Sequence, residues 1–104
     1  MLWDKKKFIL RPGKHETSPF KGVIDHIIVI PPTEKVSYNF YILDSDGDIL
    51  FQAKKRRGRI DDKDGLPVGE EKQEPLLLII TENKGFFSKP TDLHFTVIFK
   101  TREK

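Results

Sequence analysis

Two stretches of the chain, residues 36–43 and 93–99, carry a large apolar side chain at every second position. In both, the intervening positions are mostly polar or smaller. An alternation with a period of two is typical of a β-strand that buries one face and exposes the other to water. The alternating apolar residues are Val36, Tyr38, Phe40, Ile42, Leu93, Phe95, Val97 and Phe99.

The first of these stretches ends in an acidic segment, Asp44–Asp48, after which apolar residues resume at Ile49. An Asp-Gly turn between two apolar runs predicts a β-hairpin, with Gly47 at positive φ. The carboxylates also suggest a calcium loop. In an EF-hand frame, however, the sixth residue would be Ile49 instead of Gly and the twelfth Lys55 instead of Glu. We therefore interpret the segment as a structural turn and expect no metal site and no cofactor.

Pro or Gly separates nearly all of the apolar runs, and no window shows an apolar stripe with helical spacing. Short strands punctuated in this way predict an all-β protein: a single-domain antiparallel β-sandwich over residues 1–104, Ig-like or jelly-roll-like, with little or no helix. The expected core is Tyr38, Phe40, Ile42, Phe51, Leu78, Phe95, Val97 and Phe99. The polar, turn-rich residues 58–74 are expected to form a long surface loop.

Two apolar runs, Val23–Ile30 and Leu76–Ile80, show little or no polar alternation. Such a strand is either covered on both faces or in contact with a neighbouring subunit. A chain of 104 residues has little material to cover two such strands. We therefore expect a homo-oligomer or another multivalent assembly.

The charges are mixed in sign, 19 basic against 16 acidic, and the formal net charge is +3. This balance is too small to indicate nucleic-acid binding by itself. The chain has no cysteine, which excludes disulfides, thiolate zinc sites and cysteine nucleophiles. The apolar runs are far shorter than the roughly 20 residues of a membrane helix, so no membrane association is expected. No G-x-S-x-G or other catalytic motif is present, so we expect no enzyme activity.

The densest basic cluster contains Lys54, Lys55, Arg56, Arg57 and Arg59. Three interpretations are open: a charged edge strand that prevents aggregation, a surface that binds an acidic protein, and a phosphate-binding surface. Interleaved aromatic side chains, which would favour single-stranded nucleic acid, are missing. A protein partner is therefore favoured over nucleic acid.

Aromatic residues in polar surroundings are the second candidate for a partner-binding surface. Phe86 and Phe87 are adjacent in a polar segment, and Trp3 precedes three lysines. Adjacent aromatics do not easily both point inward, so one of the two is expected to anchor a contact. For residues 1–20 two alternatives are open: an extended N-terminal arm that reaches a neighbouring subunit, or an edge strand of the same domain.

The order of Ile28-Val29-Ile30-Pro31-Pro32, Tyr38–Asp44, Asp46-Gly47-Asp48, Leu66-Pro67-Val68 and a final strand at 93–99 resembles small all-β virion proteins of tailed bacteriophages, the capsid decoration (cement) and head or tail accessory proteins. The resemblance implies a non-enzymatic structural protein that is made in the host cytoplasm, incorporated in the virion and bound to capsid or other virion proteins. It implies no functional residues. The alternative is a β-sandwich module that binds carbohydrate or nucleic acid.

Overall fold

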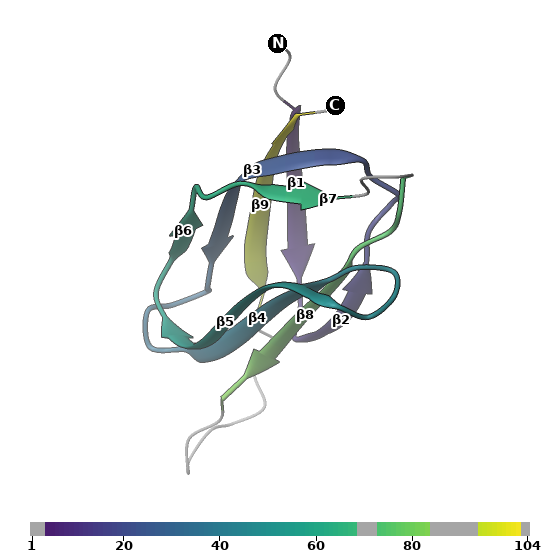
Figure 1. Cartoon of the computed structure of the whole chain (residues 1–104). Helices are drawn as coiled ribbons and strands as arrows, with labels where there is room; N and C mark the ends of the chain where they lie inside the picture. The colour runs from purple at the N-terminus through teal and green to yellow at the C-terminus, as the bar shows by residue number, and fades with distance from the viewer. Residues whose placement is uncertain (1–3, 69–72, 84–93, 103–104) are drawn as a thin grey trace.

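The computed structural model describes residues 4–68, 73–83 and 94–102, which form two antiparallel β-sheets packed against each other (Figure 1). The all-β prediction is confirmed, and no helix occurs among these residues. The first sheet has the order β1 (Asp4–Leu10), β9 (Phe95–Arg102), β3 (Gly22–Ile30), β6 (Ile60–Asp62), with β7 (Leu66–Val68) also paired to β3. The second has the order β2 (Gly13–Glu16), β8 (Leu77–Glu82), β4 (Ser37–Leu43), β5 (Ile49–Arg57).

The core lies between the sheets and consists of the inward-facing residues of the alternating strands. Seven of the eight residues that the alternation predicts are buried: Tyr38, Phe40, Ile42, Leu78, Phe95, Val97 and Phe99. The eighth, Phe51, packs against this cluster but is half-buried, because β5 is the last strand of its sheet and no strand covers its outer side among the described residues. Aromatic contacts join the sheets, with the rings of Tyr38 and Phe95 5.1 Å apart.

The hairpin between β4 and β5 forms at the acidic turn, as predicted. Gly47 has a φ of 89°, in the region that glycine enters without steric cost. One carboxylate oxygen of Asp44, Oδ1, accepts hydrogen bonds from the backbone N–H groups of Asp46 and Asp48, each at 2.9 Å. The acidic side chain therefore satisfies the backbone of the turn.

The prediction of a long surface loop over residues 58–74 is wrong at residues 60–62 and 66–68. This segment contains β6 and β7, two three-residue strands that both pair with β3. Each strand buries one apolar side chain, Ile60 or Val68. The short strands were missed because a single buried residue leaves no periodic pattern in the sequence.

Of the two alternatives for the N-terminal segment, the edge strand is the one that the structure shows for residues 4–16. β1 pairs with β9 along its whole length, from Asp4 with Thr101 to Leu10 with Phe95. The chain then crosses to the other sheet, where β2 pairs with β8. The chain crosses between the sheets again from β5 to β6, on the opposite side of the sandwich. The sandwich thus has two edges, one at β1 and β2 and one at β5 and β6.

Both runs of little polar alternation are inner strands. β8 lies between β2 and β4, and β3 is flanked by β9 on one side and by β6 and β7 on the other. In β8, Leu78 and Ile80 face the core while Leu77 and Ile79 are half-buried on the other side. Along residues 4–68, 73–83 and 94–102, nothing resembles a membrane-spanning helix.

Candidate functional site

The basic residues singled out in the sequence lie together at one edge of the sandwich, and we call Lys54, Lys55, Arg56, Arg57 and Arg59 the basic segment. The first four end β5 and Arg59 lies between β5 and β6. All five side chains are exposed. β5 pairs only with β4, so the segment occupies an open sheet edge in the described part of the chain.

A β-bulge shapes the middle of the basic segment. The register passes from Phe40 opposite Ala53 to Tyr38 opposite Arg56, which places both Lys54 and Lys55 against one residue of β4. Lys55 has a φ of 52° and is the only non-glycine residue at positive φ among those described. Such strain persists only where the surroundings impose it. The bulge shifts the alternation of the strand and thereby redirects its basic side chains.

A side chain of β4 fixes the bulge in place. The amide oxygen of Asn39 accepts a hydrogen bond from the backbone N–H of Lys55, at 2.9 Å. The amide nitrogen of Asn39 donates to Thr81 Oγ1 at 2.8 Å and to Asn83 Oδ1 at 2.9 Å. The strained residue of the basic segment is therefore bound to a polar network that includes β8.

Tyr38 holds the far end of the basic segment. Its ring is fully buried in the core, and its hydroxyl donates a hydrogen bond to the carbonyl of Gly58 at 2.7 Å. Burial raises the pKa of Tyr38 to about 12, although the positive charge of Arg56 acts in the opposite direction. The neutral phenol thus ties the core to the crossing between β5 and β6.

Only one residue of the basic segment forms an ion pair with a described acidic residue. Asp61 of β6 is hydrogen-bonded to His26 of β3, and this bond holds the pKa of Asp61 below its usual value. Arg59 Nη2 lies 4.0 Å from Asp61 Oδ2, which is the only ion pair of the basic segment with a described residue. A groove of about 380 Å³ lies between β5 and β6 and is lined by Lys54, Arg56 and Asp62, among others.

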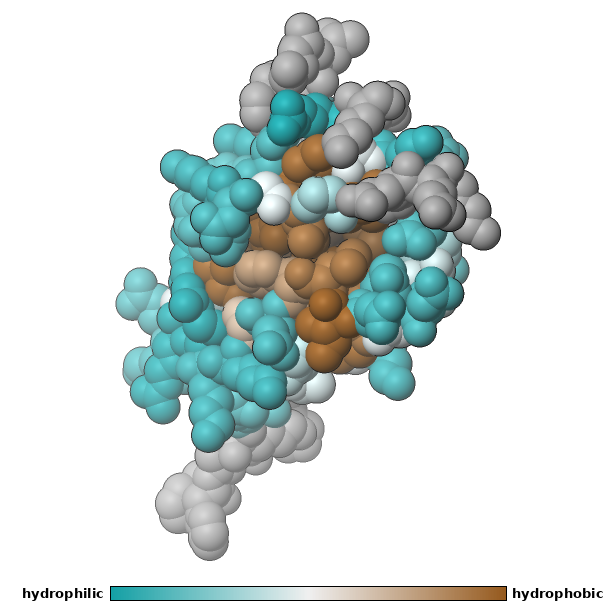
Figure 2. Space-filling model, in the orientation of Figure 1, coloured by the Kyte–Doolittle hydropathy of each residue, from teal (hydrophilic) through white to brown (hydrophobic). Residues whose placement is uncertain are grey.

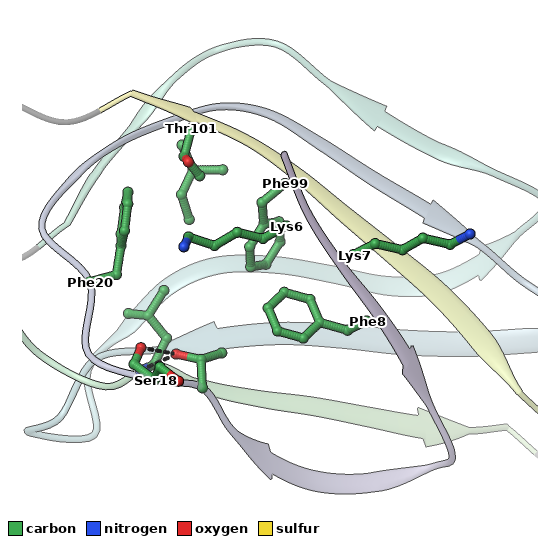
Figure 3. Close-up of a pocket in the computed structure, with 10 residues that line it drawn as sticks. Lys6, Lys7, Phe8, Ser18, Phe20, Phe99 and Thr101 are labelled. Carbon is green, nitrogen blue, oxygen red and sulfur yellow. Dashed lines mark hydrogen bonds between the residues drawn. The ribbon is translucent and has the colours of Figure 1, made fainter. Parts of the chain in front are cut away.

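The opposite edge of the sandwich contains a different feature, which we call the edge cleft. It has a volume of about 210 Å³ and lies between β1 and residues 17–20, the segment that leads from β2 to β3 (Figure 3). Its walls are mainly apolar, and its cation is the ammonium of Lys6, 5.5 Å from the centre of the Phe20 ring. The principal lining residues are Lys6, Phe8, Thr17, Phe20, Leu76 and Phe99.

Backbone hydrogen bonds hold the outer wall of the edge cleft. Phe20 and Glu74 exchange two of them, at 2.9 and 3.1 Å, and Thr17 N–H donates to the carbonyl of Leu76 at 2.8 Å. The hydroxyl oxygen of Thr17 accepts from Leu76 N–H at 3.0 Å. The wall is therefore anchored to residues 74–76, the segment that leads into β8, and the cleft is preformed.

The candidate residues from the sequence are only partly placed. Trp3, Phe86 and Phe87 lie outside the described residues. The edge cleft was missed, although the alternation Lys6, Phe8, Leu10 signals that Lys6 shares the inward side of β1 with two apolar residues. Among residues 4–68, 73–83 and 94–102, no three acidic, histidine or cysteine side chains are grouped as metal ligands.

Comparisons with protein-family models, with curated proteins and with solved structures find no match to this chain.

Proposed function

We propose that this protein is a non-enzymatic docking module that binds an acidic surface of a larger protein assembly through the basic segment. The observation that carries the proposal is the run of four consecutive cations on an open, bulged edge strand, all exposed and none in an ion pair with a described residue. Unpaired cations gathered on one edge attract a negatively charged partner and orient it during encounter.

The strain at the bulge supports a binding role over simple protection of the edge. Exposed lysines would block edge-to-edge pairing from a regular strand as well. A regular strand needs no residue at positive φ, whereas Lys55 is held there by Asn39. Strained, anchored backbone is more typical of a site whose side chains must point in set directions.

The surface also offers apolar area for a partner to cover. Figure 2 shows apolar side chains gathered in the middle of the face seen in Figure 1, with hydrophilic side chains around them. Exposed large apolar residues also occur on both sheets: Ile9 and Ile30, at 65% and 37% of their full accessibility, flank Thr96 in the first sheet, and Ile49, at 56%, lies in the second. Apolar area inside a polar rim is the composition of protein interfaces. Charge would then guide association, and apolar contacts would hold the complex.

The specific form of the proposal is a virion protein, a capsid decoration subunit that docks on and stabilises the shell. It comes from the resemblance to small all-β phage proteins and agrees with a compact β-sandwich that presents a basic edge. Decoration subunits of that kind gain affinity from many weak contacts repeated over a shell. Homo-oligomerisation would multiply the contacts further.

Cosedimentation tests this proposal. Wild-type protein should pellet with particles assembled from the genome that encodes the chain, and the variant with Lys54, Lys55, Arg56 and Arg57 changed to Gln should remain in the supernatant. A matched control changes Lys5, Lys7, Lys14 and Lys21, exposed or half-buried cations elsewhere, to Gln and should still pellet.

The second arm measures binding to a single-stranded oligonucleotide at physiological salt. Absence of particle binding, combined with tight and salt-sensitive oligonucleotide binding, would overturn the proposal in favour of a nucleic-acid-binding module.

A further inference from the structure

The edge cleft has the features of a small-molecule site that is separate from the basic segment. Its apolar wall consists of the side chains of Phe8, Phe20, Ile24, Leu76 and Phe99. Phe8 and Phe99 pack edge to face, with ring centres 5.6 Å apart, so two of the rings are fixed against each other. Sites for small ligands are typically apolar pockets with a few polar groups that set orientation.

The volume of the cleft is sufficient for an aromatic ring with a short substituent. A dry cavity of about 150 Å³ lined by Leu, Ile and Phe binds benzene in another protein, and the edge cleft measures about 210 Å³. The additional space accommodates a substituent of a few atoms. A larger ligand would have to extend out of the cleft.

The polar groups of the cleft indicate the charge of the ligand. Figure 3 shows the ammonium of Lys6 beside the Phe20 ring, whereas the side chain of Lys7 extends in the opposite direction. The side-chain hydroxyl of Thr17 is already engaged, since it donates to the carbonyl of Ser18 at 2.9 Å. Lys6 thus supplies the cleft with one full positive charge, which suits one negative charge on the ligand.

Lys6 already has a weak partner that a ligand could replace. Its Nζ lies 3.6 Å from Asp4 Oδ2, and the side chains of Lys6 and Asp4 are 40% and 69% exposed. Exposed ion pairs of this kind contribute little. A ligand anion held against the apolar wall would therefore compete successfully for the ammonium.

From these observations we propose that the edge cleft binds small monocarboxylates with an apolar body about the size of a phenyl ring. The ring lies among Phe8, Phe20 and Phe99, and the carboxylate pairs with Lys6 at the mouth. A single cation favours a carboxylate over a phosphate ester, whose second charge would remain unpaired. Ten or so heavy atoms support an affinity on the order of millimolar.

Titration with phenylacetate, followed by amide NMR spectra, tests the proposal. Phenylacetate should shift the amide signals of residues 6–8, 17–20 and 99–101 together, and should bind more tightly than 2-phenylethanol, the neutral analogue, or phenethylamine, the cationic one. Equal affinity of the three compounds, or shifts spread outside these residues, would overturn the proposal.

Three single substitutions should affect phenylacetate binding in three different ways. Lys6→Met should remove the preference for phenylacetate over 2-phenylethanol, a loss of about two- to fivefold for an exposed ion pair. Lys7→Met, the matched control, should leave it unchanged. Asp4→Asn should strengthen phenylacetate binding, because it removes the competing carboxylate. If Lys6→Met and Lys7→Met behave alike, the ammonium of Lys6 has no role in binding. These results are independent of whether the basic segment binds a partner.

Discussion

The two edges of this sandwich are similar in construction and opposite in chemistry. At each edge the chain leaves one sheet and enters the other, from β1 to β2 and from β5 to β6. The first edge is hollow and apolar, with one cation beside an aromatic ring. The second presents five exposed cations and a more polar groove of about 380 Å³.

The difference arises from how the connecting segments are held at each edge. At the first edge, residues 17–20, which lead from β2 to β3, are hydrogen-bonded to residues 74–76, and the edge cleft lies between this segment and β1. At the second, the hydroxyl of Tyr38 binds Gly58 and draws the crossing onto the core. The first edge therefore has an apolar cleft suited to a small ligand, whereas the second has a more polar groove beside exposed cations that a charged partner can contact.

The largest expected effect comes from a residue on which both edges depend. Phe95 pairs with Leu10 of β1 and packs its ring against Tyr38. Because it is fully buried, Phe95→Ala should lower the free energy of unfolding by about 3–5 kcal/mol. Urea denaturation measures this loss, with Ile49→Ala, at an exposed position, as the control. A loss below that of the control would contradict the assigned core.

A substitution in the β4–β5 turn should destabilise one edge of the sandwich and leave the other unchanged. Gly47→Val should cost roughly 1–3 kcal/mol, because a β-branched residue resists the φ of 89°. An added Cβ would meet no atom within 4 Å, so the cost is one of backbone conformation and not of a clash. Gly47→Asn should cost less, since Asn tolerates positive φ. Amide exchange should accelerate in β5 and not in β1; equal acceleration in both strands would show that the edges are not independent.

Removal of the Tyr38 hydroxyl tests the contact between the core and the segment that connects β5 to β6. Tyr38→Phe should cost about 1 kcal/mol by the loss of the hydrogen bond to Gly58. The pKa of Tyr38 is raised to about 12 in the folded protein, against about 10 in an unfolded chain. The unfolded state therefore releases the proton first, and the stability that this group contributes is present below pH 10 and declines between about pH 10 and 12.

The pH dependence of unfolding checks this prediction. Wild type should lose more stability than Tyr38→Phe across that alkaline interval, because contributions common to the two proteins cancel in the difference. Parallel curves for the two proteins would show that Tyr38 does not titrate as a buried phenol.

The sequence predicted the strands whose pattern is local and missed those that depend on distant partners. The alternation in residues 37–43 and 95–99 appears in β4 and β9, because each of these strands buries one face in the core and leaves the other face more exposed. β6 and β7 exist because β3 offers them an edge, which no pattern within three residues reveals.

The candidate surfaces likewise differ in whether they depend on local sequence or on contacts between distant residues. The basic segment could be identified from the sequence alone, because four of its five residues are consecutive and the fifth follows after one glycine. The bulge at Lys55 and its anchor at Asn39 could not, because that contact joins two strands. The edge cleft requires Phe8, Phe20 and Phe99, three residues that only the fold brings together.

The smallest expected change in stability belongs to the basic segment. Arg56→Gln combined with Arg57→Gln should alter the free energy of unfolding by no more than about 0.5 kcal/mol, as is usual for exposed side chains. Thermal denaturation measures it. A larger loss would mean that these arginines stabilise the sandwich, and the segment would then be structural.

The rate of association with the encoded particles, measured over a range of salt concentrations, tests the central claim most directly. If the basic segment guides docking, added salt should slow wild-type association, and the Arg56→Gln, Arg57→Gln protein should associate more slowly and with a weaker salt dependence. The Lys5→Gln, Lys7→Gln protein should behave like wild type. Identical salt dependence in all three proteins would contradict the account.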